Sequence, residues 1–255
     1  MRWNNRTEFV LGAAALLCGA LLIARAMPQK RLTSAPLHAP SAPVSQPVPD
    51  GETHGRTLPE FFVMIDPSHG GDDKGAVFGG KLLEKDFTLA LARALRKELE
   101  ERGISARLLR DSDVNLSLER RAEVTNEQHA VIYIALHAGP LGKGVRVYMP
   151  MLPFAQAPAT GRFLPWESAQ APALERSRAV ARAVTAELRK TDLQVVGLAA
   201  PLRPLNNLVT PAIAVEWAPG AGGWQPLEKQ KLENTLASAL ASGIAKARGQ
   251  MGGRP

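Results

Sequence analysis

Short apolar runs alternate with longer amphipathic segments through most of the chain. Apolar residues dominate positions 61–66, 130–136 and 212–217, and Pro, Gly or His lies close to the end of each run. Runs of this length predict buried β-strands. Two further short strands are expected at 104–109 and 144–149.

The segments between these runs have helical spacing. In 86–102, Leu89, Ala92, Leu95 and Leu99 recur every three or four residues, and Gly103 follows as a helix stop. Helices are likewise expected at 117–127, where Ser117 would be the N-cap, and at 174–190 and 227–246. Strands that are apolar along their length need cover on both faces, so the pattern predicts an α/β fold, a single domain whose sheet is flanked by helices on both faces.

The N-terminal quarter of the chain has a different pattern. Arg2 and Arg6 precede an apolar run at 9–24, which fits either a signal peptide or a membrane anchor over residues 1–27. Residues 28–59 are rich in Pro, Ala and Ser and predict a disordered linker. The folded domain is then expected at 60–250, and the apolar run predicts export to the periplasm or the outer face of the cytoplasmic membrane.

Charge and cysteine content limit the chemistry. The formal net charge is +7, but no basic run is interleaved with aromatic residues, so no nucleic-acid partner is expected. Cys18 is the one cysteine of the chain, which excludes an intrachain disulfide and a thiolate metal cluster. A metal site would therefore use His, Asp and Glu.

Polar residues occur where the apolar strands end. His69 lies just past the first strand, His137 follows 130–136, and Glu216 lies near the end of 212–217. Carboxyl ends of parallel strands meet at one edge of a sheet, where ligands bind. Glu84, before the first helix, lies on the loop that leaves that edge. Two His and one Glu match the three protein ligands of catalytic zinc, which would leave Glu216 as the general base.

Each of these residues also has an ordinary explanation. A single His after a strand is more often a hydrogen-bonded loop residue, and Glu84 suits the first turn of a helix, where the dipole favours a carboxylate. Glu216 is harder to dismiss, because an ionised Glu in an apolar strand is costly unless it is paired.

Four separated segments resemble the zinc-dependent N-acetylmuramoyl-L-alanine amidases. They are VMIDPSHGGDDKGA at 63–76, LEKD at 83–86, ALHA at 135–138 and PAIAVE at 211–216. The resemblance spans roughly the whole folded part and implies a mixed, mostly parallel sheet. It also implies one zinc ion held by His69, Glu84 and His137, with Glu216 as the catalytic carboxylate and peptidoglycan as substrate.

The chain departs from the family pattern at two positions near the site. Ser68 stands where the family usually has Gly, and Gly139 where it usually has Asn. These departures leave open an inactive wall-binding scaffold. Another zinc hydrolase such as a carboxypeptidase also stays open, because the same His and Glu residues would serve it and the sequence does not show the substrate contacts.

Smaller expectations concern the surroundings of the site. Asp66 is a candidate to orient His69, or to cap the turn at Pro67, whereas Asp72 and Asp73 are expected as turn residues. The long loop at 150–172 contains Phe154, Phe163 and Trp166 and predicts either a lid over the site or a segment pinned to the domain.

Overall fold

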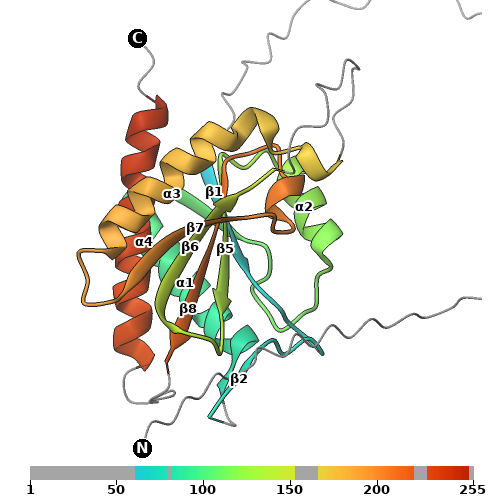
Figure 1. Ribbon diagram of the computed structural model, residues 1–255. Helices are drawn as coiled ribbons and strands as arrows, with labels where there is room; N and C mark the ends of the chain where they lie inside the picture. Colours follow the sequence, from blue (N-terminus) through green and yellow to red (C-terminus); the bar gives the residue numbers. More distant parts are fainter. Residues whose placement is uncertain (1–60, 80–81, 153–165, 221–228, 253–255) are drawn as a thin grey trace, which may run out of the picture. The chain divides into compact units, whose positions relative to one another are not determined.

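The central feature is a six-stranded sheet with the strand order β4-β1-β5-β8-β6-β7. The structure is a computed structural model that describes residues 61–79, 82–152, 166–220 and 229–252 (Figure 1). The expected signal or anchor, with its possible tether at 9–24, and the linker at 28–59 lie outside the described residues. No helix among the described residues is long and apolar enough to span a membrane.

The sheet is mixed and mostly parallel, as the family resemblance implied. The pairs β4–β1, β1–β5, β5–β8 and β6–β7 are parallel, and β6 runs antiparallel to β8. The strands are β1 (Phe62–Pro67), β4 (Ser105–Leu108), β5 (Ile132–Ala138), β6 (Lys143–Pro150), β7 (Val195–Ala200) and β8 (Ala212–Pro219). The strand ends of β1, β5 and β8 therefore lie at the same edge, as the sequence predicted.

Helices cover both faces of the sheet, which confirms the predicted layer architecture (Figure 1). The helices are α1 (Glu84–Glu100), α2 (Leu118–Glu127), α3 (Leu174–Leu188) and α4 (Lys229–Gly252), with short 3-10 turns η1 (Trp166–Ser168), η2 (Ala171–Ala173) and η3 (Leu205–Asn207). The larger core lies under α1, α3 and α4. The smaller core lies on the opposite face, under α2 and η3. Alternate residues of each central strand point into each core, which is why these strands are apolar throughout.

Local sequence explains where α2 begins and where α1 ends. Ser117 accepts a hydrogen bond from the backbone N–H of Arg120 and so caps α2. Gly103 has φ 67° just after α1, and the N–H of Ile104 then bonds back to the carbonyl of Leu99.

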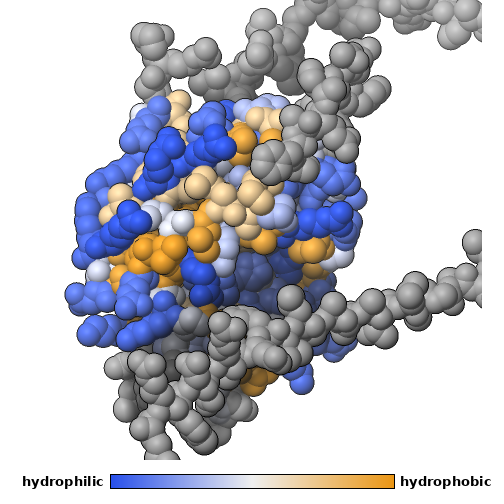
Figure 2. Space-filling model, in the orientation of Figure 1, coloured by the Kyte–Doolittle hydropathy of each residue, from blue (hydrophilic) through white to orange (hydrophobic). Residues whose placement is uncertain are grey.

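Three details differ from the sequence expectation. Helix α1 begins at Glu84, two residues earlier than predicted, so Glu84 is its first residue rather than part of the preceding loop. A two-stranded hairpin, β2 (Val77–Phe78) and β3 (Leu82–Leu83), precedes it. The edge strand β7 was not predicted, because Gly197 interrupts a short segment whose Val196 and Leu198 stay exposed. On the face of the molecule that is turned to the viewer in Figure 2, apolar residues gather over the middle, within a rim of hydrophilic ones.

Candidate metal centre

Three side chains from three elements meet at the predicted edge of the sheet. His69 lies in the loop after β1, Glu84 opens α1, and His137 lies near the end of β5. One ligand atom from each lies within 4.8 Å of the others. These are the three residues predicted from the sequence as metal ligands. Within the described part of the chain, they form a group that could hold a metal ion.

The distances place Glu84 between the two imidazoles. Its Oε1 lies 3.2 Å from His69 Nε2 and 3.1 Å from His137 Nδ1. The other ring nitrogens are occupied: His69 Nδ1 lies 2.8 Å from Asp73 Oδ2, and His137 Nε2 lies 2.8 Å from Ser68 Oγ. When those outer nitrogens carry the protons, Nε2 of His69 and Nδ1 of His137 have free lone pairs that converge with a carboxylate oxygen, a donor set suited to zinc.

The backbone beside these ligands needs unusual conformations. His69 has φ 62°, in the left-handed region that is uncommon for a residue other than Gly. Gly75, at φ 62°, lies so close that an added Cβ would be 2.6 Å from both Glu84 Oε2 and His69 Cδ2. The loop therefore turns tightly around the ligands, and such conformations concentrate at functional sites.

The electrostatics favour an ionised Glu84. Burial by itself would raise the pKa of Glu84, but hydrogen bonds with His137 and His69 and from the backbone N–H groups of Ala76 and Ala138 outweigh it and hold the pKa far below its usual value. The pKa of His69 is raised, chiefly by its hydrogen bond with Glu84 and further by Asp73, against the effect of burial. Glu84 is 5% exposed, so its charge acts in a largely desolvated place.

Glu216 lies in the same row of the sheet as His137. On β5 and β8 these two residues are direct partners, and Arg146 of β6 is the partner of Glu216 on the other side. Directly opposite residues point to the same face, so all three project from the α2 face of the sheet. Arg146 binds both oxygens of Glu216: its Nε donates to Oε2 at 2.9 Å, and its Nη2 lies 2.8 Å from Oε1. Tyr148 donates to Oε2 at 2.9 Å.

Arg146 and Tyr148 affect the pKa of Glu216. Burial raises its pKa, but the hydrogen bonds from Arg146 and Tyr148 act more strongly together, and the net pKa lies below the usual value. The carboxylate is therefore ionised near neutral pH, as a general base must be.

A buried network supports the ligand loop from behind. Asp66 accepts hydrogen bonds from Arg121 and Tyr133, and Arg121 also donates to the carbonyls of Pro67 and His69. Arg110 donates to the carbonyls of Pro67 and Ser68. The proposal that Asp66 orients His69 was wrong, because Arg121 and Tyr133 take both of its oxygens.

Asp73 contacts His69 instead. The sequence treated it as a turn residue, which it is, since it pairs with Gly70 across the loop, but its carboxylate also faces the ring nitrogen. Arg146 and Tyr148 were missed altogether. The available signal was two polar side chains at alternate positions of one strand, next to a strand with a buried Glu.

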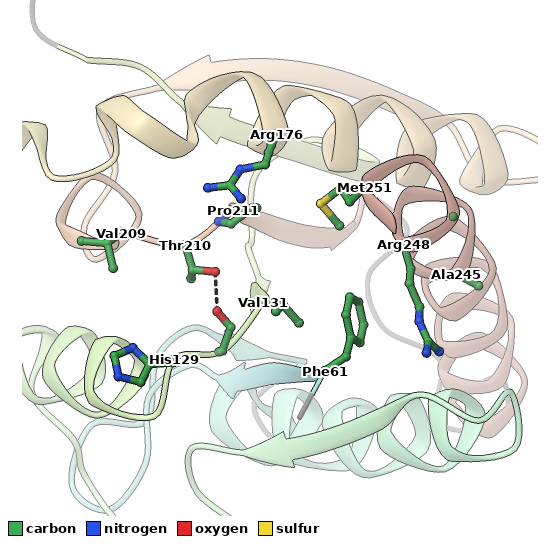
Figure 3. A pocket seen from close by; sticks show the side chains of 12 residues that line it. Phe61, His129, Val131, Arg176, Val209, Thr210, Pro211, Ala245, Arg248 and Met251 are labelled. Atoms are coloured by element: carbon green, nitrogen blue, oxygen red, sulfur yellow. Dashed lines mark hydrogen bonds between the residues drawn. The ribbon is translucent and has the colours of Figure 1, made fainter. Parts of the chain in front are cut away.

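A cavity of about 220 Å³ borders the ligands. His69, Asp73 and His137 line it together with residues 115–118 before and at the start of α2, and with Arg203 and Pro204. A larger cavity of about 850 Å³ lies at the opposite edge of the sheet and is lined by Phe61, Thr210 and Arg248 among others (Figure 3). None of the described residues lining that larger cavity carries a carboxylate, and the candidate metal ligands His69 and His137 line the smaller one.

The loop predicted as a lid begins away from the ligands. Because β6 runs antiparallel to β8, it carries the chain from the His137 edge to the opposite one. There Asn206 donates to the carbonyl of Met151. Residues 153–165, with Phe154 and Phe163, lie outside the described part, so the lid stays a prediction.

Solved structures provide the first comparison. The amidase AmiC2 of Nostoc punctiforme is 27% identical, with a TM-score of 0.58, over 74% of this chain and 98% of that one. The amidase Ami1 of Mycobacterium smegmatis has the same TM-score of 0.58 at 19% identity, over 74% of this chain and 97% of that one, which shows a shared fold.

Sequence relatives point the same way. The amidase AmiC of Neisseria meningitidis is 32% identical over 115 residues, which are 44% of this chain and 28% of that protein. An endolysin of Bacillus phage SPP1 is 29% identical over 191 residues, 72% of this chain and 65% of that protein. The match to the Neisseria relative thus spans little more than a quarter of its length. The family model described as N-acetylmuramoyl-L-alanine amidase matches residues 63–246, nearly the whole described part, and the chain belongs to this family.

Proposed function

We propose that this chain is a zinc-dependent hydrolase that cleaves the amide bond between N-acetylmuramic acid and L-alanine in peptidoglycan. The observation that carries the proposal is the convergence of His69, Glu84 and His137, with Glu216 in the same row of the sheet. Family membership supplies the bond that is cut, and relatives with amidase names support it.

The residues have distinct roles in this proposal. His69, Glu84 and His137 would hold one zinc ion, with Asp73 and Ser68 fixing the two imidazoles from outside. Bound zinc supplies Lewis-acid polarisation of the scissile carbonyl and a water molecule of lowered pKa. Glu216 takes the proton of the attacking water and returns it to the departing L-alanine amine. The lowered pKa of Glu216 means that the carboxylate is ionised near neutral pH before it takes the proton.

The two departures from the family pattern fit this active site. Ser68 contributes its hydroxyl to His137 at 2.8 Å, where a Gly would contribute nothing. Gly139 leaves room for the carboxylate of Glu216, since a Cβ there would lie 1.9 Å from Oε1. The scaffold alternative depended on these two positions, and both support the site's geometry rather than dismantling it.

Export completes the proposal. Peptidoglycan lies outside the cytoplasmic membrane, and residues 1–27 as signal or anchor and 28–59 as spacer would bring the domain at 60–250 to it. The expected compartment is the periplasm or the outer face of the cytoplasmic membrane, which cell fractionation with an antibody against the domain would test.

The deciding experiment combines metal content with product masses. Purified protein should contain one zinc per chain, and digestion of peptidoglycan should release peptides that begin with a free L-alanine amine. Loss of a terminal stem residue without such peptides would indicate a carboxypeptidase. Full zinc occupancy with intact peptidoglycan would indicate a scaffold.

A further inference from the structure

The carboxylate of Glu216 is held unequally at its two oxygens. Oε2 accepts from both Arg146 Nε and Tyr148 OH, each at 2.9 Å. In the part of the chain that the structure describes, Oε1 accepts only from Arg146 Nη2, at 2.8 Å. An ionised carboxylate has about two acceptor positions on each oxygen, so Oε2 is saturated and Oε1 retains one.

Oε1 is also the oxygen that lies on the β5 side of Glu216. It sits over Gly139, two residues beyond His137, at the position that a Cβ would occupy. Oε2 is turned toward Tyr148 on β6. The free acceptor position is therefore on the β5 side of the carboxylate, the side of His137.

Arg146 is itself anchored on its far side. Its Nη1 donates to the carbonyl of Leu141 at 2.7 Å, in the loop between β5 and β6. A bidentate guanidinium with a third anchor fixes both the position and the plane of its partner carboxylate. A Lys at this place would supply the charge without the fork.

We propose that Arg146 and Tyr148 are positioning residues that fix Oε2 of Glu216 and present Oε1 as the proton acceptor, in a space that Gly139 must leave open. The inference rests on the proposed function, because it assigns the roles within that active site. It also accounts for an Asn-to-Gly departure at 139: in this chain the ion pair fills the space that a side chain at 139 would take.

Gly139 offers a selective way to disturb the arrangement. Its φ lies outside the left-handed region, so Ala is tolerated by the backbone, and the atom that an added Cβ would strike is the mobile end of Glu216. Gly139→Ala should thus move the carboxylate and leave the fold intact. Gly197→Ala is the matched control, since its Cβ would meet only Thr185 Oγ1 at 3.8 Å.

The test measures kcat and KM of the full chain on a soluble muramoyl-peptide, with zinc content and melting temperature. Arg146→Met should lower kcat about 10- to 100-fold with little change in KM, because a misplaced base costs rate rather than binding. Arg146→Lys should recover part of the loss, and Tyr148→Phe should lose less. Zinc content should stay at the wild-type level, and Arg178→Met, which removes an exposed arginine of α3, should match the wild type.

The double variants separate this inference from the proposed function. In a Glu216→Gln background, Arg146→Met and Gly139→Ala should have no further effect on kcat, since both act through Glu216. A Glu216→Gln variant of full activity would refute the role of the base itself. A low Glu216→Gln activity with an unchanged kcat in Arg146→Met would overturn the positioning role, and a raised kcat would in addition show that Arg146 holds back the base.

Discussion

Two polar clusters lie at the same edge of the sheet, one around Asp66 of β1 and one around Glu84, and Arg121 links them by donating to the carbonyl of His69. The network around Asp66 is almost fully buried, although it borders the same cavity of about 220 Å³: Asp66 and Arg121 have side chains 1% and 4% exposed. The cluster around Glu84 opens to a cavity, and the side chains of His69 and His137 are 25% and 39% exposed. The same sheet edge thus carries a buried cluster and an accessible one.

Hydrogen bonding differs between the two in the same way. Asp66 is filled by Arg121 and Tyr133, and burial and Asp66 together raise the pKa of Tyr133 so that it stays a neutral donor. In the Glu84 cluster, two ring nitrogens and a carboxylate oxygen lie within 4.8 Å of one another. The oxygens of Asp66 are taken up by its own partners, whereas the Glu84 cluster has lone pairs that can bind a ligand.

Mutations in the two clusters are expected to have different effects. Removing one group from the buried network should destabilise the protein, because a buried charge is left unpaired. Removing one group from the open cluster should change metal binding or rate and leave the fold nearly unaffected.

The largest effect is expected for His137→Ala. The variant should lose bound zinc and hydrolysis together, because two remaining ligands hold the ion poorly. Atomic absorption and a wall-digestion assay measure this, and the unfolding of the metal-free proteins should differ little. His129→Ala, an exposed histidine at the opposite edge, should keep its zinc. Full zinc occupancy in His137→Ala would remove His137 from the ligand set.

The next largest effect is expected for Arg121→Met, which should lower the free energy of unfolding. It leaves Asp66 charged and buried, which typically costs about 3–5 kcal/mol in the free energy of unfolding. Urea titration gives the value, with Arg120→Met as control, because the Arg120 side chain is 55% exposed and its pairing with Glu123 contributes little. A loss below about 1 kcal/mol for Arg121→Met would contradict the buried character of the network.

Glu216→Gln should lower kcat at least about 10²-fold, since an amide of the same size cannot take a proton. Zinc should remain bound. Glu175→Gln, on an exposed side chain of α3, serves as the control. Loss of zinc with Glu216→Gln would mean that Glu216 is a ligand, and the roles of Glu84 and Glu216 would be exchanged.

Asp73→Ala should have the smallest effect. Removing the acceptor of His69 Nδ1 frees the ring to turn, and losses of this kind weaken metal binding about 10- to 100-fold. Competition with a chelator measures the affinity, and Asp72→Ala, its exposed neighbour, should match the wild type. Equal losses in both variants would point to the charge of the loop rather than to the contact with His69.

Much of this molecule followed from its linear pattern. The continuous apolar runs around Val63, Ile134 and Val215 required a sheet covered on both faces, and polar residues at the ends of those runs identified His69, His137 and Glu216. The pattern of apolar residues within one short segment is enough to predict a buried strand, and the carboxyl ends of parallel strands must meet at one edge of the sheet.

Tertiary structure decided which partners these residues have. The sequence favoured Asp66 as the neighbour of His69, but the turn in which Gly70 pairs with Asp73 brings Asp73 to the ring, while Asp66 accepts from Arg121. Arg146 reaches Glu216 only because β6 pairs antiparallel with β8 in one register. Such choices depend on strand register and loop conformation, which long-range pairing fixes, and a one-residue slip would turn Arg146 to the other face.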